Sequence, residues 1–104
     1  MAESINVISP TGEYDILIQP GVLKNRDLLP EILKISRCAV LTNETVATIH
    51  GEQLVADLPD AKLITMPDGE QYKNLETVSQ LYASMISAGM DRNSVVVALG
   101  GGVV

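Results

Sequence analysis

Apolar runs that suit strands alternate along the chain with stretches that have the spacing of helices. The runs at 37–42, 62–66 and 95–99 predict three strands, and two β-rich runs at 5–9 and 14–19 predict a further pair that can form a hairpin. The first and last of the three runs are apolar almost throughout. Such a pattern is typical of strands that are buried on both faces.

Three segments between these runs are predicted to be helical: 21–33 as short turns broken near Pro30, and 44–58 and 75–88 by their helical spacing. Gly51 weakens the second of these predictions, whereas Asn74 as N-cap and Gly89 just past the C-terminus support the third. Alternating helices and strands predict an α/β fold, a Rossmann-like and mostly parallel sheet with flanking helices. A chain of 104 residues is expected to form one domain, residues 1–104.

Composition excludes several classes of function. The formal net charge is −6, and no cluster of Lys or Arg offsets it, so binding to nucleic acid is not expected. Residues 1–10 lack the apolar core of a signal peptide, and no apolar run is long enough to cross a bilayer. A cytoplasmic protein without membrane contact is therefore expected. The single cysteine, Cys38, cannot form an internal disulfide, and no spacing of ligands indicates a metal site.

Three distinctive loops follow the three predicted parallel strands. They are Asn43-Glu44-Thr45 after the first, the segment 68–73 (DGEQYK) after the second, and Gly100-Gly101-Gly102 after the third. The carboxyl ends of parallel strands share one edge of a sheet, and ligands of open α/β sheets bind there. The three loops are therefore predicted to converge on one site.

Each loop also has a purely structural interpretation. The glycines allow a phosphate to approach backbone N–H groups, but they equally suit a tight turn or a loose tail, and their spacing is not G-x-G-x-x-G. Glu70 could accept hydrogen bonds from a ribose and Lys73 could supply a cation near phosphate, although the segment also resembles a surface turn before a helix. Asn43 and Thr45 could bind an adenosine edge, or one of them caps the following helix, which we favour for Thr45.

Four segments together resemble the N-terminal domain of the 3-dehydroquinate synthase family: "PTGEYDILIQPGVL", "VLTNETVA", "MPDGEQYKNLETV" and "DRNSVVVALGGGVV". The resemblance runs from about residue 6 to the last residue. It is specific because "DGEQYKNLET" is followed, one helix later, by "DR…ALGGGVV". In the family the glycine motif continues as GGGVVGD into a helix, so the resemblance implies an N-terminal fragment that stops before a helical second domain.

The resemblance implies that NAD contacts all three loops. The glycines and the two valines would lie beside the pyrophosphate, and 68–73 on the ribose and nicotinamide side. Asn43 would lie near the adenosine end, where relatives often have Asp. The implied cofactor-binding residues are Asn43, Thr45, Asp68, Gly69, Glu70, Gln71, Tyr72, Lys73, Gly100, Gly101, Gly102, Val103 and Val104.

The family converts 3-deoxy-D-arabino-heptulosonate 7-phosphate, a small sugar phosphate, into 3-dehydroquinate and phosphate in the shikimate pathway. The resemblance implies transient oxidation by NAD, elimination of phosphate, re-reduction and aldol closure, aided by a zinc or cobalt ion. The family's metal ligands and catalytic lysines would lie outside 1–104, so no catalytic or metal residue is predicted here. A homodimer is expected for the full-length protein, and this fragment alone is expected to be inactive.

Three alternatives remain open at this stage. Another sugar-phosphate cyclase, such as an inosose or valiolone synthase, would share the fold, NAD and the glycine loop. A glycerol dehydrogenase or iron-dependent alcohol dehydrogenase would share the glycines, but the "DGEQYK" segment argues against it. The isolated chain could also be a non-catalytic nucleotide-binding module.

Overall fold

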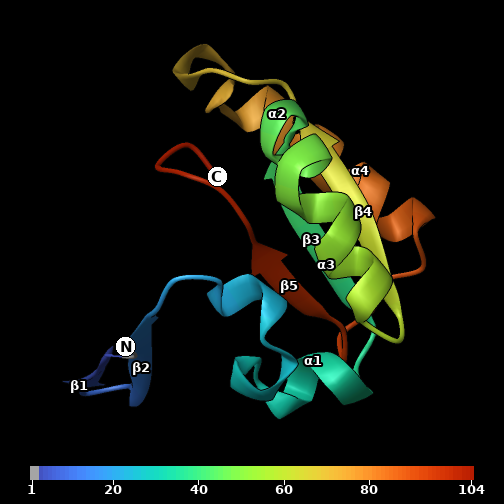
Figure 1. Ribbon diagram of the computed structural model, residues 1–104. Coiled ribbons are helices and arrows are strands. Elements are labelled where there is room, and N and C mark those ends of the chain that lie inside the picture. The colour runs from blue at the N-terminus through green and yellow to red at the C-terminus, as the bar shows by residue number, and fades with distance from the viewer. Residues whose placement is uncertain (1–2) are drawn as a thin grey trace.

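A three-stranded parallel sheet forms the centre of the chain. The computed structural model describes residues 3–104. The strands β3 (Cys38–Asn43), β4 (Ala61–Met66) and β5 (Val95–Ala98) lie in the order β4-β3-β5 (Figure 1). The three strands predicted from the apolar runs and their parallel arrangement are thereby confirmed.

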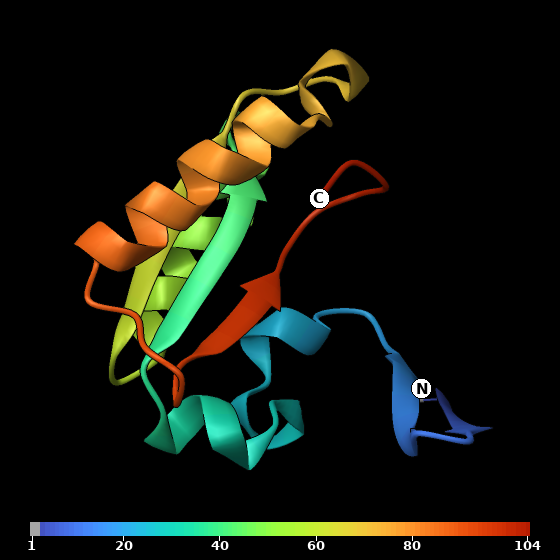
Figure 2. The ribbon, with the colours of Figure 1, turned by 180° about the vertical axis from the view of Figure 1, so that it is seen from behind.

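Helical segments cover both faces of this sheet. Between β3 and β4 the chain forms α2 (Glu44–Val46), the single π turn η3 (Ala47–Gly51) and α3 (Glu52–Asp57), which together lie on one face (Figure 1). The long helix α4 (Leu75–Ser87) lies on the other face, as the reverse view shows (Figure 2). The two helical connections take opposite faces because β4 and β5 lie on opposite sides of β3 and each right-handed crossover turns the same way.

The ends of α4 are those that the sequence predicts. The Asn74 side chain accepts a hydrogen bond of 2.9 Å from the backbone N–H of Thr77, which is the N-cap geometry. Gly89 has a φ of 84°, and its N–H donates to the carbonyl of Ile86 at 3.0 Å. This left-handed ending satisfies a carbonyl that the last turn leaves unpaired.

The core lies between the sheet and α3. Cys38, Ala39 and Val40 of β3 have no exposed surface, and Leu54 of α3 is almost fully buried against this strand. A side chain on Gly51 would place its Cβ 3.0 Å from Leu63 Cδ1, so the glycine allows the helical segment to approach the sheet closely. The residue that weakens the helix prediction therefore also lets this helical turn pack closely on Leu63.

One expectation about strand burial is wrong. The strand β3 is buried on both faces as predicted, but Val96 of β5 is 54% exposed. The reason is position in the sheet: β5 is an edge strand, and α4 packs against β4 rather than over β5. A continuously apolar run does not distinguish a central strand from an edge strand that is covered on one face.

The N-terminal hairpin is a separate two-stranded sheet. Its strands β1 (Glu3–Ser9) and β2 (Gly12–Ile18) pair antiparallel, which confirms the predicted hairpin, but they do not join the central sheet. The apolar side chains Ile5, Tyr14 and Ile16 share one face of this hairpin and are exposed. Three short elements lead from it to β3: η1 (Val22–Lys24), η2 (Arg26–Leu28) and α1 (Glu31–Ile35). Among residues 3–104, none of the helices combines the length and hydropathy that a membrane span requires.

Cys38 should make the stability of the fold depend on pH. Burial, together with the nearby charge of Asp60, raises the pKa of the Cys38 thiol. Because the folded pKa is the higher one, this contribution to stability is complete below the unfolded pKa of about 8.5 and is lost as pH rises further. Urea unfolding at pH 7 and pH 10 should therefore show a larger loss of stability in the unmodified chain than in Cys38→Ala. Equal losses in the two proteins would contradict this.

Candidate functional site

The three predicted loops meet at the carboxyl edge of the central sheet. The Thr45 hydroxyl donates to the Asp68 carboxylate at 2.6 Å, and the Thr45 N–H reaches the other carboxylate oxygen at 3.2 Å. On the other side, Lys73 Nζ donates to the carbonyl of Gly102 at 3.5 Å. The loop 68–73 therefore contacts both the segment after β3 and the segment after β5, and the predicted convergence is confirmed.

The segment after β3 starts a helix, and its cap is Asn43. The Asn43 side chain accepts from the N–H of Val46 at 2.9 Å, while the Asn43 backbone is extended. Thr45, which the sequence favours for this role, does not provide the cap. Thr45 lies inside the first turn, and its hydroxyl is used by Asp68. Neither side chain is left without a partner.

The loop 68–73 presents its two charged groups together. Gly69 has a φ of 114°, which favours glycine, and it precedes the 3-10 turn η4 (Glu70–Tyr72). In a 3-10 turn, side chains three residues apart eclipse one another. Lys73 Nζ accordingly lies 3.9 Å from a Glu70 carboxylate oxygen, and both side chains are exposed. An exposed pair of this kind adds little to stability, so both charges can turn to a ligand at small cost.

The glycine loop after β5 is open on one side. A Cβ added to Gly100 would lie 3.0 Å from Val104, because the chain turns back there, whereas a Cβ on Gly101 or Gly102 would meet no atom within 4 Å. The space beside Gly101 and Gly102 in the Cβ direction is therefore open.

An apolar cavity lies beside these glycines. It has a volume of about 380 Å³, and Val103 and Val104 line it together with Val78 of α4. Lys73 also contributes to its wall. Its size falls within the usual range for ligand pockets. The family resemblance implies that the two valines lie near a pyrophosphate, but no sequence pattern predicts that α4 forms part of the same cavity.

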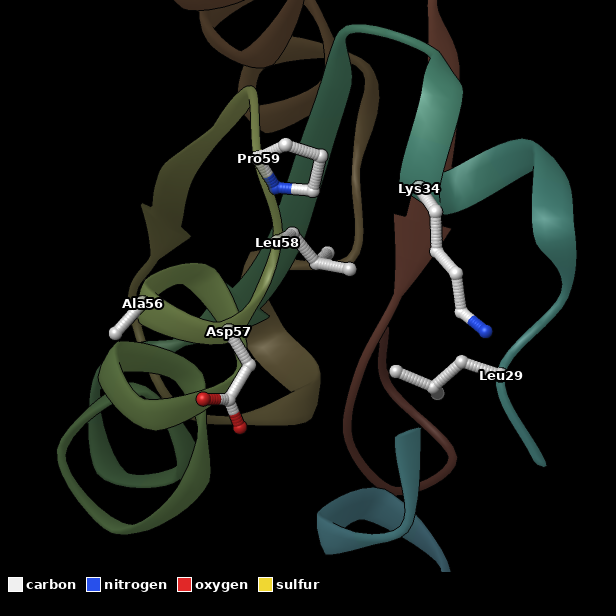
Figure 3. A pocket seen from close by; sticks show the side chains of 6 residues that line it. All are labelled: Leu29, Lys34, Ala56, Asp57, Leu58 and Pro59. Atoms are coloured by element: carbon white, nitrogen blue, oxygen red, sulfur yellow. The ribbon is translucent and has the colours of Figure 1, made fainter. Parts of the chain in front are cut away.

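A second cavity lies at the opposite, amino end of the sheet. Its volume is about 420 Å³, and Figure 3 shows Lys34 of α1 and Asp57 of α3 on its two sides, with Leu58 between them. Lys34 pairs with Glu31 at 3.1 Å, and Asp57 accepts a hydrogen bond from Gln53 at 3.3 Å. Because both charges are engaged within their own helices and no predicted site residue lines this cavity, we do not assign it a role.

Comparisons with known proteins point to one family. Residues 63–104 match the family model described as 3-dehydroquinate synthase N-terminal. The 3-dehydroquinate synthase of Pelobacter propionicus is 45% identical over 99 residues, which cover 89% of this chain and 27% of that protein. Over these residues the chain is similar to the 3-dehydroquinate synthases. The enzyme of the same name from Prochlorococcus marinus is 36% identical over 109 residues, covering 94% of this chain and 30% of the relative.

The chain thus spans about 30% of the length of the 3-dehydroquinate synthases that it matches. A solved structure of 2-deoxy-scyllo-inosose synthase, complexed with carbaglucose-6-phosphate, NAD+ and Co2+, superposes with a TM-score of 0.80 at 18% identity. That alignment covers 97% of this chain and 29% of the solved one. A second structure of 2-deoxy-scyllo-inosose synthase gives a TM-score of 0.73. These likenesses show a shared α/β fold.

The region matched by the 3-dehydroquinate synthase model contains two of the three loops, 68–73 and 100–104. Within these loops, the Glu70 and Lys73 side chains are exposed, and the space beside Gly101 and Gly102 is open. Sequence reasoning missed the bond between Thr45 and Asp68. The two residues are 23 positions apart, and no local pattern predicts a pairing at that separation.

No metal centre is found in the part of the chain that the structure describes. Among residues 3–104, no three side chains of His, Cys, Asp or Glu lie close enough to hold an ion. Cys38 is buried in β3, whereas His50 is exposed on the π turn. The residues present do not fit a divalent metal, and no chemical step is assigned to one here.

Proposed function

We propose that this chain is the NAD-binding part of a 3-dehydroquinate synthase. The whole enzyme would convert 3-deoxy-D-arabino-heptulosonate 7-phosphate into 3-dehydroquinate and phosphate. The observation that carries the proposal is the convergence of three strand ends, with Lys73 of one loop in contact with Gly102 of another. The relatives named 3-dehydroquinate synthase support the choice of enzyme. Residues that bind the sugar phosphate and the metal would belong to a different region of the enzyme.

Different residues of the site would contact different parts of the cofactor. The backbone N–H groups at Gly101 and Gly102 would approach the pyrophosphate, since no side chain fills the space there. Lys73 would move from the Gly102 carbonyl to the phosphate, and Glu70 would accept hydrogen bonds from ribose hydroxyls. When bound, NAD would accept a hydride from the substrate and later return it.

Lys73 would affect the charge balance at the cofactor site, because the protein is acidic. The chain has 13 acidic residues and 7 basic ones, and Lys73 is the basic residue of the three loop segments 43–45, 68–73 and 100–104. The pyrophosphate of NAD carries negative charge, which Glu44, Asp68 and Glu70 in the same loops would repel. A cation at the meeting point of two loops offsets part of that repulsion.

A titration of the 104-residue chain with NAD, followed by NMR of the backbone amides, tests the proposal. Chemical shift changes confined to 43–45, 68–73 and 100–104 are expected, because these segments form the edge of the sheet that would contact the cofactor. Changes centred on other residues, or none at millimolar NAD, would contradict the assignment of a cofactor site to this chain.

Replacing Gly101 with alanine should weaken NAD binding without changing the stability of the fold. The added methyl group would meet no atom within 4 Å, and Gly101 does not have a positive φ, so the unfolding temperature should stay nearly unchanged. The same methyl group would occupy the space through which a phosphate reaches the backbone, and NAD binding should weaken about tenfold or more, equal to about 1.4 kcal/mol. Calorimetric unfolding and an NAD titration of the same sample measure both effects. Unchanged affinity would remove Gly101 from the site.

A further inference from the structure

Asp68 occupies the amino end of the helical segment that begins with α2. Its two carboxylate oxygens accept from the N–H and the hydroxyl of Thr45, at 3.2 and 2.6 Å. The next N–H of the same turn, that of Val46, is bound by the Asn43 side chain. The chain itself therefore supplies the acceptors that an anion would otherwise provide at a helix start.

The parallel register explains why these two residues meet. Asn43 of β3 is level with Met66 of β4, so the strands end at the same height. Thr45 and Asp68 each follow the end of their strand by two positions, and neighbouring strands lie about 4.8 Å apart. A hydroxyl on one side and a short carboxylate on the other can bridge that separation.

The loop that contains Asp68 has little else to hold it. Residues 70–76 are exposed throughout, and the hydrogen bonds within η4 are local. Its described polar links to other parts of the fold are the bond to Thr45 and the weaker 3.5 Å contact of Lys73 with Gly102. A hydrogen bond to an ionised carboxylate at 2.6 Å is stronger than one between neutral groups.

We propose that Thr45 and Asp68 form a latch that fixes the loop 68–73 and so positions Glu70 and Lys73 toward the glycine loop. In this inference, which rests on the proposed function, both act as positioning residues through the bonds between them. Because the latch fills the helix start after β3, the pyrophosphate is directed to the glycines after β5. That location lies at the crevice between β3 and β5, where the strand order reverses.

The variants Thr45→Val, Thr45→Ser and Asp68→Ala of the 104-residue chain test the latch. The matched control is Thr48→Val, because Thr48 lies on the same helical segment and its hydroxyl contacts only the carbonyl of Glu44 among the described residues. Two quantities are measured: hydrogen exchange of the Tyr72 and Lys73 amides without NAD, and the dissociation constant for NAD.

Loss of the latch should accelerate exchange at both amides about tenfold and weaken NAD binding by a similar factor. Thr45→Ser, which keeps the hydroxyl, should restore both quantities, and Thr48→Val should change neither. Adding Thr45→Val to Asp68→Ala should change neither quantity further, since Asp68→Ala already removes both bonds to Thr45. Unchanged exchange in Thr45→Val and Asp68→Ala, or no rescue by serine, would overturn the latch. Faster exchange in a chain whose unmodified form binds no NAD would support the latch and overturn the cofactor site.

Discussion

Replacing Lys73 with methionine is expected to weaken NAD binding about 10- to 100-fold, which corresponds to about 1.4 to 2.7 kcal/mol. Methionine keeps much of the apolar stem but removes the ammonium group. In the folded chain that group lies between Glu70 and the Gly102 carbonyl, at the point where two loops meet. Without it, the acidic groups of the loops would face the pyrophosphate uncompensated. Isothermal titration calorimetry with NAD measures the loss.

Lys62→Met is the matched control for this prediction. Lys62 is also exposed and lies on β4, but it is near the amino end of that strand, away from the three loops. The two variants have the same net charge, so a general electrostatic effect would weaken NAD binding equally in both. The specific effect of Lys73 should also shrink at high salt, because an exposed charge is screened. Equal affinities for the two variants would contradict the role of Lys73.

Of the substitutions considered, Leu54→Ala should cause the largest decrease in the free energy of unfolding, about 3 kcal/mol. Leu54 is 3% exposed and packs into the cluster that joins α3 to β3, alongside Val40. The central sheet has three strands, and a domain of this size has a net stability of about 5 to 15 kcal/mol, so the loss is a large fraction of the total. Urea unfolding followed by circular dichroism would measure the change.

Ile49→Ala is the control for the Leu54 variant. Ile49 precedes Leu54 by five positions in the same helical segment but is 61% exposed. Its truncation removes a comparable apolar group that solvent already contacts, and a change within about 0.5 kcal/mol is expected. If both variants lost the same stability, the proposed position of the core between α3 and the sheet would be wrong.

Much of the fold could be predicted because its signals are local. The alternation of strand and helix patterns follows from which residues each element buries, and Asn74 and Gly89 mark the ends of α4 through bonds within a few residues. The site was predictable in outline for the same reason. Each loop directly follows its strand, and parallel strands bring their ends to one edge.

The details that the sequence did not predict depend on distant parts of the chain. The sequence favours Thr45 as the cap of α2, but Asn43 provides it, because the Thr45 hydroxyl bonds Asp68 on another loop. Gly51 is unfavourable for a helix by its propensity, yet it lies close to Leu63 of β4. In both cases a contact with a residue distant in the sequence outweighs the local preference.

The sequence by itself determined the class of fold, the ends of α4, and which three loops meet at the carboxyl edge of the sheet. These features arise from hydrophobic periodicity, from capping and from glycine, all of which act over a few neighbouring residues. Only the tertiary structure decided that β5 is an edge strand with Val96 exposed, that Asp68 bonds Thr45, and that Lys73 reaches Gly102. These depend on strand order and register, because residues far apart along the chain become neighbours only when the sheet forms.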